Sequence, residues 1–312
     1  MARVERFSGL LSPVLTPFGE DLSPDVDRLI GHCKWLLERS CNLAPFGTTS
    51  EGNSLSAAEK ADILDRLVAA GIPAASMMPG TGTCAIADTA MLSAKAAELG
   101  CGGVLMLPPF YYKNVGDDGL YAAYDAVIQR AGSADLRIYL YHIPPMSQTP
   151  ISLGLIERLL KAYPETVAGI KDSSGEWDNT KAMLDARFDD FRIFVGSESF
   201  LLANMRNGGA GCISATANVN PAAIHELYER WRDDDAEDRQ ADLDAVRAIF
   251  VEYAAIPALK ACVAHFAGDP GWALTRPPLM PLDAEKASKT VEALLARGFD
   301  MPGLAGAKAA AE

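Results

Sequence analysis

The chain has 312 residues, of which 49% are hydrophobic and 22% charged. This composition is typical of a folded protein and excludes a disordered one. Its 28 Lys and Arg residues face 41 Asp and Glu residues, which gives a formal net charge of −13. Nucleic acid and anionic membranes are excluded as partners, because both bind clustered positive charge and the sequence has no basic cluster.

The N-terminal segment lacks the apolar core of a signal peptide, and no run of 18 apolar residues occurs anywhere. The cysteines occur singly and mostly inside apolar runs, which indicates buried, reduced thiols and a cytoplasmic protein. They are Cys33, Cys41, Cys84, Cys101, Cys212 and Cys262.

Short apolar runs bounded by Gly, Pro, Ser or Thr predict eight strands along the chain. In order they are Leu11–Leu15, Cys41–Phe46, Ala74–Met78, Val104–Leu107, Arg137–Tyr141, Val167–Ile170, Arg192–Val195 and Cys212–Ser214. Amphipathic segments between them predict helices over Asp25–Arg39, Ala57–Ala70, Ala85–Leu99, Gly119–Ala131, Leu153–Ala162, Asn179–Ala186, Glu198–Asn207 and Pro221–Trp231. Ser56 and Glu59 form the pattern of a capping box before the second helix.

Eight strands, each followed by a helix, predict an α/β protein built as a (β/α)8 TIM barrel. A doubly wound open sheet is the alternative, because alternation of strands and helices does not prove closure. The length of the chain fits a single barrel with an appendage as well as two domains.

The acidic run Asp233 to Asp244 marks the predicted boundary and is interpreted as a solvated turn between helices. The catalytic barrel would then span residues 1–232, and a C-terminal helical extension residues 233–312. Helices are predicted in the extension over Leu243–Tyr253, Ile256–Phe266 and Ala284–Ala296. The Ala- and Gly-rich end, Gly303–Glu312, is expected to be frayed.

Functional side chains of a barrel lie at the carboxyl ends of its strands. The second strand leads into Gly47-Thr48-Thr49-Ser50-Glu51-Gly52, whose hydroxyls and free N–H groups could bind a carboxylate or a phosphate. A simple turn that caps the next helix explains the same residues.

Lys171 closes an apolar strand, and Tyr141 ends the strand before it. Desolvation at such a position favours a neutral, nucleophilic amine, and a tyrosine at the same height could transfer protons. Pairing with a nearby carboxylate is the ordinary role of a single lysine and remains the alternative.

Two other patterns are interpreted as structural. Gly80-Thr81-Gly82-Thr83-Cys84-Ala85 matches a loose dinucleotide-binding pattern, but the next strand ends in Pro108-Pro109 without the acid that such a site needs. Cys262 and His265 form one isolated pair on a helix, which favours core packing over zinc binding.

Five groups of residues together resemble one family along the whole barrel. They are Gly47–Glu51, Tyr111-Tyr112, Tyr141-His142-Ile143-Pro144, Gly169-Ile170-Lys171-Asp172 and Gly211-Cys212-Ile213-Ser214. The chain resembles the dihydrodipicolinate synthase / N-acetylneuraminate lyase family, the class I pyruvate-dependent aldolases. The likeness extends to the tail through Ile256–Lys260 and Arg276–Leu279.

The resemblance implies a Schiff base between Lys171 and the ketone carbon of pyruvate or another 2-oxo acid, with no metal or organic cofactor. Tyr141 would transfer protons to and from the reacting oxygen, in a relay with Thr48 and with Tyr112, which in family members reaches into a neighbouring subunit. Thr48 and Thr49 would bind the pyruvate carboxylate. The remaining substrate-binding positions implied are Ser173, Gly196, Ile213 and Met146.

Three positions depart from the family patterns. Met146 stands where dihydrodipicolinate synthases carry an Arg that binds the carboxylate of aspartate semialdehyde, and a thioether cannot pair with an anion. His142 replaces the usual Asn. Glu198 is the one acid left of the pair with which sialic acid lyases bind sugar hydroxyls.

These departures favour an aldolase or lyase that joins or cleaves pyruvate and a neutral or polyhydroxylated aldehyde, for example of the 2-keto-3-deoxy sugar acid type. The first alternative is 4-hydroxy-tetrahydrodipicolinate synthase, which condenses pyruvate with aspartate semialdehyde in lysine biosynthesis. The second is a non-catalytic 2-oxo-acid sensor, although a sensor needs no proton relay. The aromatic group Phe110-Tyr111-Tyr112 predicts a homo-oligomer, a dimer or a tetramer.

Overall fold

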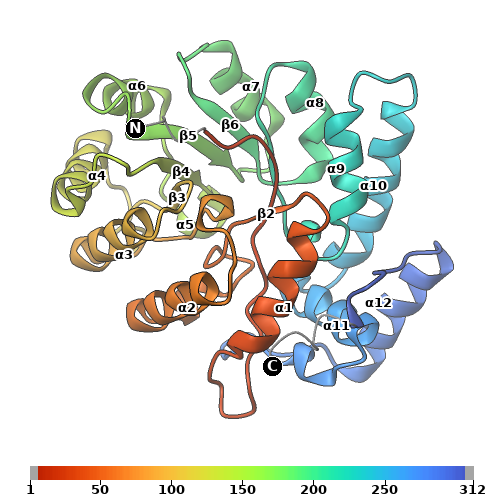
Figure 1. Cartoon of the computed structure of the whole chain (residues 1–312). Coiled ribbons are helices and arrows are strands. Elements are labelled where there is room, and N and C mark those ends of the chain that lie inside the picture. The colour runs from red at the N-terminus through yellow and green to blue at the C-terminus, as the bar shows by residue number, and fades with distance from the viewer. Residues whose placement is uncertain (1–5, 306–312) are drawn as a thin grey trace.

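A computed structural model describes residues 6–305, and the predicted frayed end beyond residue 305 lies outside the described residues. Seven parallel strands form one curled sheet surrounded by helices (Figure 1). Their order in the sheet is β2-β1-β7-β6-β5-β4-β3. The strands are β1 (Gly9–Ser12), β2 (Asn42–Leu43), β3 (Val104–Met106), β4 (Ile138–His142), β5 (Val167–Asp172), β6 (Arg192–Val195) and β7 (Gly211–Ile213).

The strand predicted over Ala74–Met78 is wrong in its first part, because Ala74–Ser76 is a short 3-10 turn, η2, that follows Pro73. The turn closes when the Met77 N–H donates to the Ala74 carbonyl (2.9 Å). Beyond it, Met77 bridges Leu43 of β2, and Gly80 bridges Leu105 of β3. The segment from Met77 to Gly80 therefore contacts both edge strands of the sheet.

The other predicted strands exist, with ends shifted by one to three residues, and β6 matches its prediction. The prediction over Val167–Ile170 stopped too early, because β5 continues through the charged residues Lys171 and Asp172. A search for apolar runs does not detect polar residues at a strand's carboxyl end, which is where functional side chains are expected.

Alternation along the strands divides the core into two clusters. On β4, Tyr139 and Tyr141 belong to the cluster enclosed by the curled sheet, whereas Ile138 and Leu140 belong to the cluster between the sheet and the helices. Ile170 lies in the outer cluster, so its neighbour Lys171 projects into the space enclosed by the sheet.

The helices that follow the strands agree closely with the predictions. They are α1 (Val26–Leu37), α2 (Ala57–Ala69), α3 (Ile86–Glu98), α4 (Asp117–Ala131), α6 (Leu153–Ala162), α7 (Trp177–Asp185), α8 (Leu201–Arg206) and α9 (Pro221–Glu229), with a short α5 (Pro144–Ser147) after β4. The predicted capping box is confirmed: the Glu59 N–H donates to Ser56 Oγ (3.2 Å), and the Ser56 N–H donates to Glu59 Oε2 (2.7 Å). The predicted helix over Glu198–Asn207 is a 3-10 turn, η3 (Glu198–Phe200), followed by α8.

Three further helices, α10 (Ala236–Val251), α11 (Ala255–Ala267) and α12 (Ala284–Ala296), pack against one another, and α10 also packs against α9 (Figure 1). The interpretation of Asp233 to Asp244 as a turn is wrong, since α10 begins at Ala236 inside this run. Acidic residues in its first turn, Glu237 and Asp238, interact favourably with the N-terminal end of the helix dipole. The division of the chain at residues 232 and 233 stays a prediction.

All six cysteines are free, and five of them are buried as expected, while Cys84 is exposed. Burial raises the pKa of Cys33 and of Cys101 to about 12, so these thiols stay protonated at neutral pH. Within residues 6–305, no helix is both long enough and apolar enough to cross a membrane.

Candidate active site

Lys171 and Tyr141 lie at the same register position on the adjacent strands β5 and β4. The Lys171 Nζ is 3.5 Å from the Tyr141 hydroxyl and 4.4 Å from the centre of its ring. Each residue is only 3% exposed. The two side chains thus lie together at the carboxyl end of the sheet, as the sequence predicts.

Thr48, from the loop after β2, approaches the same tyrosine from the other side. Its Oγ1 lies 3.1 Å from the Tyr141 hydroxyl, so this hydroxyl bridges Thr48 and Lys171. A hydroxyl between a second hydroxyl and an amine has both a donor and an acceptor beside it. Such a row can pass a proton to or from a reacting oxygen.

The loop that carries Thr48 and Thr49 is tightly folded. The Glu51 N–H donates to the Thr48 carbonyl (3.0 Å), and Glu51 itself has a left-handed backbone with φ of 55°. Gly52 is required next, because a Cβ there would lie 2.0 Å from the Phe46 carbonyl oxygen. Thr49 stands half-buried in this loop, and among the residues that the structure describes its side chain makes no hydrogen bond to Lys171.

The carboxylate of Glu51 fixes this loop to the C-terminal helices. It forms a fully buried ion pair with Lys260 of α11 and accepts a hydrogen bond from the Arg276 N–H (2.9 Å). The Lys260 Nζ also donates to the Leu274 carbonyl (2.7 Å). Burial lowers the pKa of Lys260, and the neighbouring Glu51 opposes that shift. One buried charge pair thus links the loop of Gly47 to Gly52 with helix α11.

Ser173 and Gly196 meet beyond the ends of β5 and β6. The Ser173 N–H donates to the His142 carbonyl, and the Gly196 N–H donates to the Asp172 carbonyl, each at 2.7 Å. A Cβ on Gly196 would lie 2.1 Å from Ser173 Oγ, so only glycine fits there. Ile213, at the end of β7, is fully buried in the same enclosed cluster as Tyr141.

Asp172 follows Lys171 on β5, and His142 follows Tyr141 on β4. Their side chains therefore lie on the other face of the sheet from Lys171 and Tyr141. The Asp172 carboxylate accepts hydrogen bonds from the Ser174 N–H (2.9 Å), Asn179 Nδ2 (3.0 Å) and Thr180 Oγ1 (2.7 Å). His142 Nε2 lies 4.0 Å from this carboxylate. Burial lowers the pKa of His142, and Asp172 partly opposes this. Both residues therefore brace the ends of β4 and β5 from outside.

The Glu198 carboxylate is already bonded to other side chains. Glu198 is 1% exposed, and its carboxylate accepts hydrogen bonds from the hydroxyls of Ser214 and Thr216 and pairs with Arg247 of α10 (2.9 Å). No sequence pattern indicates Arg247 as its partner, because the two residues are 49 positions apart and share no motif.

Within this chain, Tyr112 and Met146 lie at the surface, apart from Thr48, Tyr141 and Lys171. Tyr111, Tyr112 and Met146 are exposed by 72%, 76% and 66%. Within residues 6–305, the Tyr112 hydroxyl makes no hydrogen bond to Thr48 or Tyr141. The loop that carries it is fixed to α5 by Lys113, whose Nζ donates to the Ser147 carbonyl (2.9 Å).

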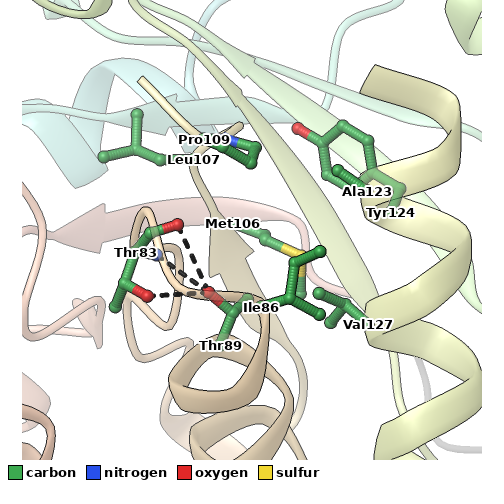
Figure 2. A pocket seen from close by; sticks show the side chains of 9 residues that line it. All are labelled: Thr83, Ile86, Thr89, Met106, Leu107, Pro109, Ala123, Tyr124 and Val127. Atoms are coloured by element: carbon green, nitrogen blue, oxygen red, sulfur yellow. Dashed lines mark hydrogen bonds between the residues drawn. The ribbon is translucent and has the colours of Figure 1, made fainter. Parts of the chain in front are cut away.

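A small apolar cavity lies between α3, α4 and the end of β3, and its lining includes none of Thr48, Tyr141 and Lys171 (Figure 2). Its volume of about 10 Å³ is enough for roughly one water molecule. Figure 2 shows the Tyr124 ring projecting from α4, and among residues 6–305 its hydroxyl has no hydrogen-bond partner. The loop of Gly80 to Ala85 borders this cavity through Thr83 and packs tightly, with Gly82 against the Leu107 backbone, as the structural interpretation expected.

Known proteins resemble this chain over almost its whole length. The model of the dihydrodipicolinate synthetase family matches residues 6–297. A DapA-like lyase of Chloroflexus aurantiacus is 35% identical, over 90% of this chain and 93% of the relative. A 4-hydroxy-tetrahydrodipicolinate synthase of Methanococcoides burtonii is 30% identical, over 89% of this chain and 94% of the relative.

Among solved structures, dihydrodipicolinate synthase from Agrobacterium tumefaciens superposes with a TM-score of 0.85 at 34% identity, covering 92% of this chain and 98% of that chain. A 2-keto-3-deoxygluconate aldolase variant of Sulfolobus solfataricus, at 20% identity, shares the fold with a TM-score of 0.83 over 93% of this chain and 96% of that chain. With the family model and these relatives in agreement, the chain is a lyase of the dihydrodipicolinate synthetase family.

Proposed function

We propose that this protein is a class I aldolase that forms a Schiff base between Lys171 and pyruvate or another 2-oxo acid. The observation that carries the proposal is the row of Thr48 Oγ1, Tyr141 Oη and Lys171 Nζ, with separations of 3.1 and 3.5 Å. A buried amine next to a proton-transferring hydroxyl has the groups that imine chemistry needs.

In the proposed reaction, the neutral Lys171 amine attacks the ketone carbon, and the carbinolamine loses water to give an imine. The imine accepts the electron pair left when a proton departs from C3, which gives an enamine. Attack of C3 on an aldehyde forms the carbon–carbon bond, and Tyr141 donates a proton to the new alkoxide. Water then releases the product and restores the amine; cleavage follows the same steps in reverse.

The substrate-binding roles follow the positions around the row. Thr48 and Thr49 would bind the 2-oxo acid carboxylate with hydroxyl and N–H groups, while the backbone at Gly196 and Ile213 lines the pocket. Ser173, in contact with Gly196, would bind the second substrate together with Met146. A net charge of −13 provides no general attraction for anions, so local groups must supply it.

We propose a neutral or polyhydroxylated aldehyde as the second substrate, as in 2-keto-3-deoxy sugar acids. The exposed Met146 provides no cation for a second carboxylate. Since Glu198 already bonds Ser214, Thr216 and Arg247, substrate hydroxyls would be bound by Ser173 and backbone groups rather than by this acid.

The alternative is 4-hydroxy-tetrahydrodipicolinate synthase, which the names of several relatives favour. A coupled assay with pyruvate and aspartate semialdehyde distinguishes the two. Turnover well above that with neutral aldehydes would establish the synthase, whereas negligible turnover would reject it. Absence of turnover on every aldehyde, together with retained 2-oxo acid binding, would indicate the sensor.

The fold that supports this chemistry is proposed to be a closed (β/α)8 barrel, with Met77 to Gly80 as its eighth strand. The bridges of Met77 to Leu43 and of Gly80 to Leu105 support closure, as do two hydrogen bonds. The Met78 N–H donates to the Leu43 carbonyl (2.7 Å), and the Leu105 N–H donates to the Pro79 carbonyl (2.9 Å).

The exposed pair Tyr111 and Tyr112 supports a homo-oligomer in which Tyr112 completes the relay of a neighbouring copy. The two rings lie edge to face, 5.3 Å apart, on the surface. Large exposed aromatic clusters favour subunit contacts. A cytoplasmic location is part of the same proposal, supported by six free cysteines.

Borohydride trapping tests the proposed function. Reduction in the presence of pyruvate should add the mass of the reduced imine to Lys171 in the wild-type protein, and no adduct should form on Lys171→Ala. An unmodified wild-type protein, or an adduct that persists in Lys171→Ala, would reject the Schiff base.

A further inference from the structure

The Glu198 carboxylate is a buried charge that the proposed chemistry does not use. Its side chain is 1% exposed, and burial of an ionised carboxylate is unfavourable unless other groups bond it fully. Its partners come from two separate parts of the chain: the segment after β7 and helix α10. Because burying a charged carboxylate costs free energy, we expect Glu198 to have a role beyond packing.

The first set of bonds joins the ends of β6 and β7. The Ser214 hydroxyl donates to one carboxylate oxygen of Glu198, and the Thr216 hydroxyl donates to the other. In return, the Glu198 N–H donates to Ser214 Oγ (3.3 Å). Because Ser214 both donates to Glu198 and accepts from it, the two loops are joined by a closed pair of hydrogen bonds.

The second set of bonds comes from α10. Arg247 Nη1 lies 2.9 Å from Glu198 Oε2. Gln240, two helical turns earlier and therefore on the same face of α10, donates from Nε2 to the Glu198 carbonyl (3.0 Å). Gln240 Oε1 accepts from the Leu202 N–H (3.1 Å). One face of α10 thus holds both the side chain and the main chain of Glu198.

These contacts lie next to the backbone that the proposed function assigns to substrate. Glu198 follows Gly196 by two residues, and Ser214 directly follows Ile213. Gly196 in turn is in contact with Ser173. A shift of Glu198 would therefore move the pocket-lining backbone of two strands together.

Besides holding Glu198 in place, Arg247 compensates the negative charge of the Glu198 carboxylate. Its own side chain is 25% exposed. Without Arg247, an unbalanced buried carboxylate would remain two residues after Gly196, which the proposed function assigns to the 2-oxo acid pocket, and like charges in a buried site repel strongly. Loss of the cation should therefore weaken binding of the anion more than it slows proton transfer at Tyr141.

We propose that Glu198 and Arg247 are positioning residues, through which helix α10 sets the affinity of the site for the 2-oxo acid. This inference rests on the proposed Schiff-base function. According to this inference, helix α10 takes part in substrate binding, although it contributes none of the residues Thr48, Tyr141 and Lys171.

The test compares the variants Arg247→Met, Arg247→Lys and the double variant Glu198→Gln with Arg247→Met. The matched control is Arg206→Met, because Arg206 also pairs with α10, through Glu237, but both side chains are exposed. For each protein, the pyruvate concentration that gives half-maximal borohydride trapping on Lys171 is measured, together with the maximal trapping rate and the thermal unfolding midpoint.

We expect Arg247→Met to raise the half-saturating pyruvate concentration about five- to tenfold while the maximal trapping rate changes by less than about twofold. Arg247→Lys keeps the charge and should retain most of the affinity. The double variant removes both charges and should recover part of the lost affinity. Arg206→Met should bind pyruvate like the wild-type protein.

The outcomes separate this inference from the function on which it rests. A wild-type protein that is not trapped rejects the Schiff base itself. If the wild-type protein is trapped but Arg247→Met has unchanged half-saturation, the inference is overturned, even when its thermal midpoint falls. Should Arg247→Met fail to fold, Arg247→Gln, which also removes the cation but keeps a polar side chain, decides: a raised half-saturating pyruvate concentration supports the inference, and an unchanged one overturns it.

Discussion

The Tyr141 hydroxyl and the Lys171 amine, on neighbouring strands at the same register position, lie 3.5 Å apart. A parallel ladder fixes this relationship, since the backbone hydrogen bonds of β4 and β5 set the height of both residues. Side chains on rigid strands need little rearrangement to react, which is how a site holds reacting groups in place.

Replacement of Tyr141 with Phe removes the hydroxyl between Thr48 and Lys171 but keeps the ring. Because general acid–base transfer typically contributes about 10²- to 10⁴-fold, we expect kcat to fall by that factor. The KM for pyruvate should change much less. Thr48→Val should lower kcat by a smaller factor, because water can replace its hydroxyl. Steady-state kinetics measure both, and a Tyr141→Phe enzyme with nearly wild-type kcat would contradict the relay.

Replacement of Lys260 with Met should destabilise the protein strongly, since it leaves the fully buried Glu51 carboxylate without its cation. Loss of one partner of a buried ion pair typically costs about 3–5 kcal/mol. The double replacement with Glu51→Gln should recover part of this loss. Urea unfolding gives the free energies. Lys289→Met, in an exposed pair with Glu285, is the control and should change stability little.

His32 should make stability depend on pH. Burial lowers the pKa of His32 from 6.5 to about 4, so the folded protein holds this ring neutral while the unfolded chain protonates it near pH 6.5. The stabilisation is complete above pH 6.5 and is lost as the pH falls toward 4, by about 3 kcal/mol in total. The difference in unfolding free energy between the wild-type protein and His32→Gln should shrink by that amount between pH 7 and pH 4. A constant difference would contradict the shift.

Mixed oligomers test the proposed role of Tyr112. Lys171→Ala and Tyr112→Phe proteins should each have low activity. Unfolding them together and refolding them should restore activity, because random pairing completes about a quarter of the sites, with Lys171 from one subunit and Tyr112 from the other. Light scattering would confirm assembly. Refolded mixtures no more active than the separate variants would reject the shared site.

The variant Met146→Arg tests the assignment of the second substrate. Met146 is 66% exposed, so an Arg side chain can be accommodated without disturbing the core. A guanidinium there can pair with a carboxylate. We expect turnover with aspartate semialdehyde to rise about tenfold relative to turnover with neutral aldehydes. The coupled assay measures the ratio, and Met146→Gln serves as the uncharged control.

The proximity of Lys171 and Tyr141 could be predicted from the sequence, because it depends on local signals. Lys171 and Tyr141 end apolar strands, and the position of a residue at a strand end largely determines where its side chain points. The sequence could not predict the Glu198–Arg247 pair, because its residues meet only when α10 packs against η3 and α8. The acidic start of α10 was misread for a related reason: many charges in a row look like a solvated turn, although they stabilise a helix N-terminus equally well.

The two buried carboxylates Glu51 and Glu198 each have their cation on a different C-terminal helix, Lys260 on α11 and Arg247 on α10. A small tilt of α10 and α11 would therefore shift the loop of Gly47 to Gly52 together with the loops after β6 and β7. Laboratory evolution for a new aldehyde should then enrich substitutions on the outer faces of these helices, well away from Lys171. Residues that never touch substrate would in this way change which substrate is preferred.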